Sequence, residues 1–154
     1  MVWSLSSGKR YVAVDCARFA GLSPRYGSMR ITIEISPGEL LDKISILEIK
    51  TERIPDGDKL AHIRRELETL SRSRAQDIPD NDGIRGLFSE LKTINETLWE
   101  IEDDIRLCEK ARDFGERFIR LARAVYITND RRAAVKSRID RLMQSDIGEM
   151  KSYA

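Results

Sequence analysis

The feature that most constrains the fold is a pair of long stretches in which apolar residues recur in alternating steps of three and four. The stretches cover residues 84–110 and 114–144, and this spacing is typical of amphipathic helices that pack side by side. The positions are Leu87, Leu91, Ile94, Leu98, Ile101, Ile105 and Cys108 in the first stretch, and Phe118, Leu121, Val125, Thr128, Arg132, Val135, Ile139 and Leu142 in the second.

The two stretches match each other when the chain is folded about residue 113. A shorter pair, residues 37–54 and 58–72, has the same helical spacing on either side of the turn PDGD. Short turns between helices favour antiparallel hairpins. The polar segment SRSRAQDIPDNDG reads as a linker between the pairs. The sequence therefore predicts an all-α fold, an antiparallel helical bundle of two unequal helical hairpins.

The residues before two of the helices predict how these helices begin. In SPGE, the hydroxyl of Ser36 can accept from the amide of Glu39, while Glu39 can reach back to the amide of Ser36. Pro37 suits the first helical position because it has no N–H to lose. In DFGE, Asp113 is the predicted cap, with Glu116 three residues later.

The amino-terminal part differs in composition from the rest. Glycine, serine and proline are scattered through residues 1–28, and only residues 11–14 suggest a strand there. We expect residues 1–28 to be a poorly ordered extension and residues 29–154 to form a single helical-bundle domain. In MRITIEIS, isoleucines at positions 31, 33 and 35 alternate with polar residues, which predicts a short strand or extended segment before the first helix.

Composition indicates which partners and which cell compartment to expect. The chain has 27 Lys and Arg against 26 Asp and Glu, with the signs interleaved, which argues against a nucleic-acid surface. Cys16 and Cys108 form no zinc or disulfide pattern, so a reducing cytoplasm is expected. No stretch approaches the roughly 20 apolar residues of a membrane span, and no signal-peptide pattern is present. We expect neither membrane insertion nor export.

The unequal hairpins suggest self-association. At about 1.5 Å per residue, the long helices extend about 40 Å and the short ones about 22 to 27 Å. Part of the long hairpin must then project or be covered by another subunit. We therefore predict a homo-oligomer, with a dimer favoured, and a strand at 31–35 that could pair with its copy.

Polar residues interrupt the seam of the long hairpin in YITNDRRAAVK. Thr128 and Arg132 occupy positions where core residues belong, and Glu96 or Glu100 is the predicted acidic partner of Arg132. One interpretation is an ion pair that fixes register, in which case Arg132→Leu is neutral or stabilising if that partner reaches water. The other is an interhelical pocket for an anionic or metal-bound ligand. The candidate ligand-binding residues are Lys43, Glu96, Trp99, Glu100, Asp103, Asn129, Arg132 and Lys136.

No established catalytic motif is present, so the sequence leaves open whether the protein is an enzyme. The carboxylate pairs 39/42 and 100/103 resemble those with which all-α pyrophosphatases hold magnesium. Alternatively, cations at positions 43, 53, 132 and 136 could clamp a dicarboxylate as in chorismate mutase. We predict no metal site and no cofactor, with magnesium only under the enzyme alternative.

The segments SPGELLDKISILEIK, NETLWEIEDDIR, LARAVYITNDRRAAVK and KSY resemble a mostly bacterial family catalogued as domain of unknown function, number 6165. The similarity covers residues 29–154. It implies a small helical protein, sometimes associated with glycosyltransferases or surface polysaccharides, and assigns no catalytic residue.

Two functional hypotheses remain. The first is a non-catalytic interaction or accessory protein with a protein partner, in glycan or surface-polysaccharide assembly. The second is a small-molecule-binding protein or enzyme that uses the polar pocket, either for magnesium-dependent nucleotide or phosphate chemistry or as a chorismate-mutase-like cationic site.

Overall fold

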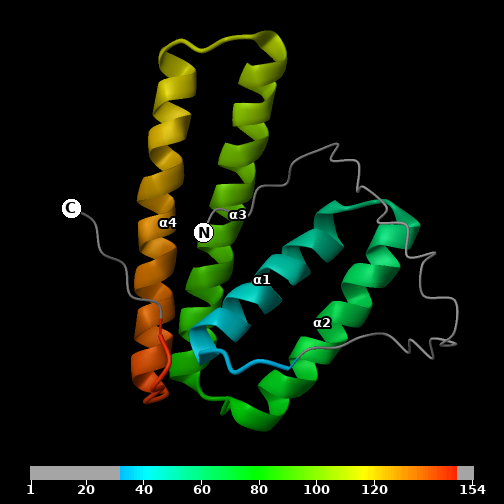
Figure 1. The fold of residues 1–154 in the computed structure, drawn as a ribbon, viewed down its shortest axis with the longest axis vertical. Helices are drawn as coiled ribbons and strands as arrows, with labels where there is room; N and C mark the ends of the chain where they lie inside the picture. The colour runs from blue at the N-terminus through cyan, green and yellow to red at the C-terminus, as the bar shows by residue number, and fades with distance from the viewer. Residues whose placement is uncertain (1–31, 149–154) are drawn as a thin grey trace, which may run out of the picture. The chain divides into compact units, whose positions relative to one another are not determined.

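The computed structural model describes residues 32–148, and all four of their helices belong to the unit Glu34–Ala154. The helices are α1, Pro37–Arg53; α2, Gly57–Asp77; α3, Asp82–Ala111; and α4, Glu116–Leu142. They form two antiparallel hairpins, α1–α2 and α3–α4 (Figure 1). The predicted all-α bundle of two unequal hairpins is confirmed.

Side-chain caps explain where three of the helices begin. The Oγ of Ser36 accepts from the amide of Glu39 at 3.2 Å, as predicted. The carboxylate of Glu39, however, bonds to Lys136 of α4 instead of returning to Ser36, so only half of the capping box forms. Asp56 caps α2, and Asn81 caps α3 by accepting from the amide of Ile84 at 2.9 Å.

The predicted cap of the last helix is wrong. Arg112 has a left-handed backbone with φ of 54°, ends α3 and turns the chain. The turn then continues to Gly115, which is the residue before α4, while Asp113 accepts from the Gly115 amide at 3.1 Å inside the turn. Asp113, the predicted cap of α4, is therefore part of the turn that reverses the chain between α3 and α4.

Helix α1 is the centre of the bundle, because it packs against each of the other three helices. In Figure 1 it runs obliquely across the long hairpin, with α2 on its other side. The core lies between α1 and the lower parts of α3 and α4. Its buried members are Leu40, Leu41, Ile44, Ile78, Ile84, Leu91, Val135 and Ile139.

The long hairpin extends well past the short one at the end where α3 turns into α4 (Figure 1). Helices α3 and α4 have 30 and 27 residues, against 17 and 21 for α1 and α2. At 1.5 Å per residue, α3 is about 20 Å longer than α1. The far part of the hairpin therefore has no contact with α1 or α2 to cover it.

The predicted strand before α1 does not form in the part that the structure describes. Residues 32–36 are neither helix nor strand, and Ser36 has an extended backbone. A strand is stable only when another strand pairs with it, and residues 32–148 contain none. The strand considered at residues 11–14 lies outside the described residues. Within residues 32–148, no helix combines the length and apolar character needed to cross a bilayer.

Candidate functional site

Polar side chains are buried where α1 crosses α3 and α4. The group, which we call the polar junction, contains Asp42 and Ser45 from α1, Asn95 from α3, and Thr128, Arg132, Lys136 and Asp140 from α4. All except Arg132 are less than 9% exposed, and the side chain of Arg132 is 19% exposed. Burial of so many polar groups requires that they bond to one another.

Asn95 is the central residue of the polar junction. Its Nδ2 donates to Asp42 Oδ1 and to Ser45 Oγ, both at 2.8 Å. Its Oδ1 lies 3.5 Å from Nη1 of Arg132, and Nε of Arg132 lies 3.9 Å from Asp42 Oδ1. A single amide thus joins α1, α3 and α4 through both of its polar atoms.

Two further contacts join α4 to the first turn of α1. Lys136 Nζ bonds to the carboxylate of Glu39. The amide of Gly38 donates to Asp140 Oδ1 at 2.6 Å. A carboxylate at the amino end of a helix also interacts favourably with the helix dipole. Asp140 therefore supplements the cap that Ser36 gives α1.

The spacing along α4 explains why its polar residues meet α1. Positions 128, 132, 136 and 140 follow one another at steps of four, which places them along one face of the helix. The first three of these positions were predicted from the sequence. Asp140, Asn95 and Ser45 were not, although the steps of four extend the series to Asp140.

The acidic partner predicted for Arg132 is wrong. Arg132 pairs with Asp42 of α1, and among the described residues neither Glu96 nor Glu100 forms an ion pair or hydrogen bond with it. Glu100 pairs instead with Arg53 at 3.2 Å and is largely exposed. The pairing predicted from the sequence considered only α3 and α4. In the structure α1 covers this pair of helices at Arg132, and its Asp42 supplies the negative charge.

The eight candidate residues are only partly brought together. Arg132 and Lys136 belong to the polar junction. Trp99 lies half-buried beside Arg53, whose guanidinium carbon is 6.0 Å from the ring centroid. Asp103 pairs with Arg106 on the exposed side of α3.

The remaining candidates are half-buried. Lys43 is on α1 and Glu96 on α3, while Asn129 on α4 donates to the carbonyl of Val125 at 3.0 Å. No ion pair involves Glu96 within residues 32–148. Of the eight candidates, only Arg132 and Lys136 thus belong to the polar junction; seven lie on the long hairpin, and Lys43 lies on α1.

Lys92 forms a second charged link between α3 and α1. Its Nζ lies 2.7 Å from Glu52 and 3.5 Å from Glu48. The hydrogen bond to Glu52, assisted by the charges of both glutamates, raises the pKa of Lys92 above its ordinary value. This link lies at the edge of the contact between α1 and α3, outside the polar junction.

The polar junction contains no orphaned polar atom and no metal cluster. Every buried side-chain nitrogen and oxygen in the described residues has a hydrogen-bond partner. No three histidine, cysteine, aspartate or glutamate residues in that part of the chain are placed to hold a metal ion. The residues are thus arranged to satisfy one another.

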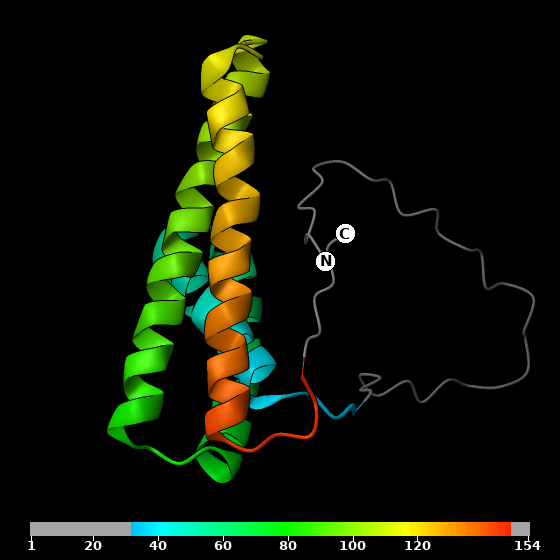
Figure 2. The same ribbon diagram turned by 90° about the vertical axis from the view of Figure 1, so that its left-hand side faces the viewer.

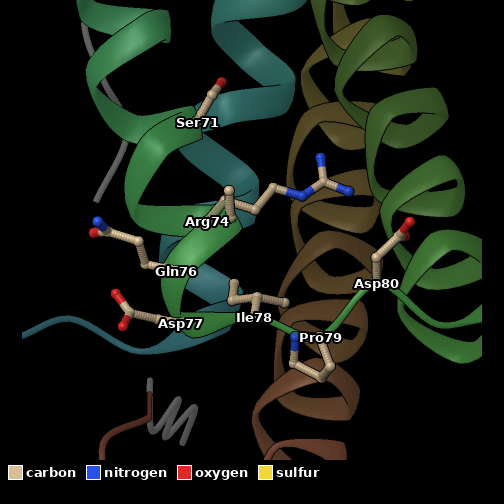
Figure 3. A pocket seen from close by; sticks show the side chains of 8 residues that line it. Ser71, Arg74, Gln76, Asp77, Ile78, Pro79 and Asp80 are labelled. Atoms are coloured by element: carbon tan, nitrogen blue, oxygen red, sulfur yellow. The ribbon is translucent and has the colours of Figure 1, made fainter.

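A hollow occurs elsewhere, at the connection between α2 and α3 (Figure 3). It is lined by Ser71, Arg74, Ala75, Gln76, Asp77, Ile78, Pro79 and Asp80. Arg74 extends from α2 toward α3, and its guanidinium carbon lies 4.4 Å from the ring centroid of Phe88. No residue of the polar junction lines this hollow, and most of its lining residues are exposed.

Comparison with known proteins identifies one family. The model described as "Family of unknown function (DUF6165)" matches residues 31–154. No curated protein and no solved structure matches the chain.

Proposed function

Because the chain belongs to this family of unknown function, DUF6165, we propose a function from the geometry: an accessory protein that acts through protein contacts made by its long hairpin. The observation that carries the proposal is the set of large apolar side chains exposed on the projecting part. They are Leu107, Phe114, Ile119, Tyr126 and Ile127, each between 42% and 57% exposed.

Exposed apolar residues are ordinary when they are scattered singly. Here five occur within 21 positions of one hairpin, on a part that no other described helix covers. Large apolar and aromatic side chains are enriched in the buried centres of protein interfaces. The concentration of such residues on a projecting element supports a protein-binding role.

The finer parts of the proposal concern the assembly and its setting. We infer a cytoplasmic homo-oligomer, most simply a dimer, in which the long hairpin supplies the interface. The resemblance noted from the sequence motifs suggests glycan or surface-polysaccharide assembly as the process. The partner in that process would be a protein, and the accessory role requires no catalytic group on this chain.

A second candidate function is a ligand site at the polar junction. One observation favours it: the Arg132 side chain is 19% exposed and that of Glu39 is 38% exposed, so the junction reaches the surface. An anionic group could then pair with Arg132 from the solvent side. The bonding of Arg132 and Lys136 to Asp42 and Glu39 opposes this candidate, because a ligand would have to displace partners already in place.

A thermal-shift screen separates the two functions. The full chain is heated with nucleotides, nucleotide sugars, magnesium and dicarboxylates, one at a time. Ligands that bind the folded state raise the midpoint of unfolding by mass action. The accessory function predicts no shift with any of them.

The matched variant for this screen is Arg132→Leu. A ligand shift in the wild-type protein that disappears in folded Arg132→Leu would establish the polar junction as the site and reject the accessory proposal. A shift that persists in the variant would place the ligand elsewhere, and would equally reject a purely non-catalytic scaffold.

A further inference from the structure

The long hairpin has a face that points away from α1. On α3 this face carries Glu90, Ile94, Thr97, Ile101 and Asp104, which follow one another in alternating steps of four and three. On α4 it carries Arg117, Ala124, Ile127, Arg131 and Arg138, at the same helical spacing. We call these residues the rear face of the hairpin.

Ion pairs show that the two halves of the rear face adjoin. Arg138 Nη1 donates to both carboxylate oxygens of Glu90, at 2.9 and 2.8 Å. At the other end, Arg117 Nη2 donates to Asp104 at 2.9 Å. Ile94, Ile101, Ala124 and Ile127 lie between these pairs. The rear face thus has an apolar centre with a charged pair at each end.

Contacts with α1 come from the other side of the hairpin. Asn95 and Lys92 of α3 bond to α1, and so do Lys136 and Asp140 of α4. At 100° per residue, these positions lie well away from those of the rear face. Figure 2 looks onto the long hairpin from the side, with α3 and α4 in front of α1 and α2.

Much of the rear face is uncovered by the rest of the described chain. Ile127 is 42% exposed and Ile101 is half-buried, while Ile94, also half-buried, packs against the edge of the core. A two-helix hairpin can shield its apolar residues from one side only, and the second side needs another partner. That partner must cover two adjacent helices at once.

The charges of the projecting part indicate what the partner is. Residues 96–111 of α3 include six acidic and two basic side chains, whereas residues 116–132 of α4 include two acidic and five basic side chains. One helix of the hairpin is therefore acidic and its neighbour basic. Two copies of such a surface are complementary when one is rotated by 180° relative to the other, because the acidic helix of each copy then faces the basic helix of the other.

We propose that a second copy of this chain packs on the rear face, related by a two-fold axis parallel to the hairpin. In this arrangement α3 of each copy lies against α4 of the other, antiparallel, and both turns are at the same end. The four helices then alternate between acidic and basic around the assembly. The other symmetric arrangement would set α4 against α4 and α3 against α3, which places like charges together.

The size of the face is sufficient for a specific dimer. Residues 90–104 and 117–138, at about 1.5 Å per residue and about 10 Å of width per helix, present roughly 500 Å², and the flanking turns of both helices bring the surface to roughly 800 Å². Standard interfaces bury about 800 Å² on each partner. The rear face is opposite to α1 and α2, so these helices do not obstruct the approach of the second copy.

This inference rests on the proposed function, because it names the partner of the same long hairpin. Its first test is sedimentation equilibrium of the full chain and of Ile127→Glu at micromolar concentration. We expect a dimer for the wild-type chain and at least a tenfold larger dissociation constant for Ile127→Glu. The control is Ala122→Glu, at an exposed residue on a different face of α4, which should leave the dimer unchanged.

Thermal unfolding of the same variants shows whether each one folds. Equal weakening by both substitutions would overturn the rear face as the interface, and so would a folded Ile127→Glu protein that dimerises like the wild type.

A second test addresses the arrangement of the copies. Glu90 and Arg138 are paired across the antiparallel hairpin. Thr97, seven positions after Glu90, therefore lies level with Arg131, seven positions before Arg138. Copies carrying Thr97→Cys are mixed with copies carrying Arg131→Cys and treated with a short thiol cross-linker. We expect links between unlike copies, beyond the background of the wild-type chain with its own cysteines. Preferential links between two Thr97→Cys copies would overturn the proposed axis.

The failure of this inference differs from that of the proposed function. A wild-type chain that stays monomeric at tens of micromolar removes the second copy as partner and leaves the accessory role to a different protein. A ligand shift that requires Arg132 removes the accessory role and leaves the dimer in place.

Discussion

Gly38 has the closest packing of any described glycine, because α4 crosses directly over it. A Cβ added there would lie 2.7 Å from the carbonyl oxygen of Lys136 and 2.8 Å from Asp140 Oδ1. The first atom is backbone and cannot move aside alone. We expect Gly38→Ala to destabilise the protein by about 1 to 3 kcal/mol, as other forced contacts in close-packed interiors do. Urea unfolding measures the difference.

Gly86→Ala is the matched control. It lies inside α3, and nothing lies within 4 Å of its added Cβ. Alanine is a better helix former than glycine by up to about 1 kcal/mol, so this variant should be as stable as the wild type or more stable. If both alanine variants unfold at the same urea concentration, the close approach of α4 to α1 is not what Gly38 provides.

Arg132→Leu tests the ion pair at the polar junction. The Asp42 side chain is only 7% exposed, so its carboxylate would stay buried after the arginine is removed. The neutral or stabilising effect expected from the sequence required an acidic partner that reaches water, and Asp42 does not. We expect a loss of about 1 to 3 kcal/mol, since the Asn95 bond remains. Denaturant unfolding measures it.

Two companion variants sharpen the test of Arg132. Glu100→Ala removes an exposed ion pair with Arg53 and should change stability by less than about 0.5 kcal/mol. Adding Asp42→Asn to Arg132→Leu should recover part of the loss, because the stranded charge is gone. A double variant less stable than the sum of the two single changes would contradict the pairing of Arg132 with Asp42.

At the scale of the element, helix α1 is held to α3 partly by charge. The raised pKa of Lys92 means that the folded state binds its proton more tightly than the unfolded state. The resulting stability is fully present below the ordinary pKa of lysine, and it is lost as the pH rises through the higher pKa of the folded state. The window therefore lies on the alkaline side, above about pH 10.

Lys92→Gln should flatten this alkaline part of the stability curve. We expect the wild type and the variant to differ most at neutral pH and to converge as the pH rises beyond the pKa of lysine. Unfolding midpoints measured in a series of buffers from neutral to alkaline pH provide the comparison. A constant difference over the whole range would mean that the contribution of Lys92 comes from packing of its chain rather than from its charge.

Much of each helix could be predicted from the sequence because apolar spacing is a local property. Helix α1 ends at Arg53, one residue before the predicted end, and α3 spans 82–111 against the predicted 84–110. Helix α2 was predicted to end at Arg72 but continues to Asp77. The segment SRSRAQD has no apolar stripe, yet its arginines, alanine and glutamine favour a helix, which ends shortly before Pro79.

The polar junction was only half predictable, for a different physical reason. Arg132 and Lys136 interrupt an apolar series, which marks them in the sequence. Asn95 and Ser45 carry no such mark, because their role depends on where α1 crosses the long hairpin. That crossing is set by packing between residues about 50 positions apart, such as Asn95 and Ser45. Spacing within a single helix contains no information about it.

On the scale of the whole molecule, the buried core begins at Leu40 and ends at Ile139. The family match likewise begins at residue 31. We predict that deletion of residues 1–28 leaves folding intact, because none of the core contacts just described requires them. Thermal unfolding of the shortened chain should remain a single cooperative transition. A broad or absent transition would show that the amino-terminal residues are needed for the fold.

The bond from Gly38 to Asp140 also has a consequence for synthesis. Its two residues are 102 positions apart, and a ribosome adds roughly 5 to 20 residues each second. The amide at the start of α1 therefore waits about 5 to 20 seconds for the carboxylate that completes its cap. During that interval α2 and α3 are made and can cover part of Leu41 and Ile44, but the α4 side of the core, with Val135 and Ile139, is still missing. We therefore expect the nascent chain to expose this side of α1 to chaperones until α4 has left the ribosome.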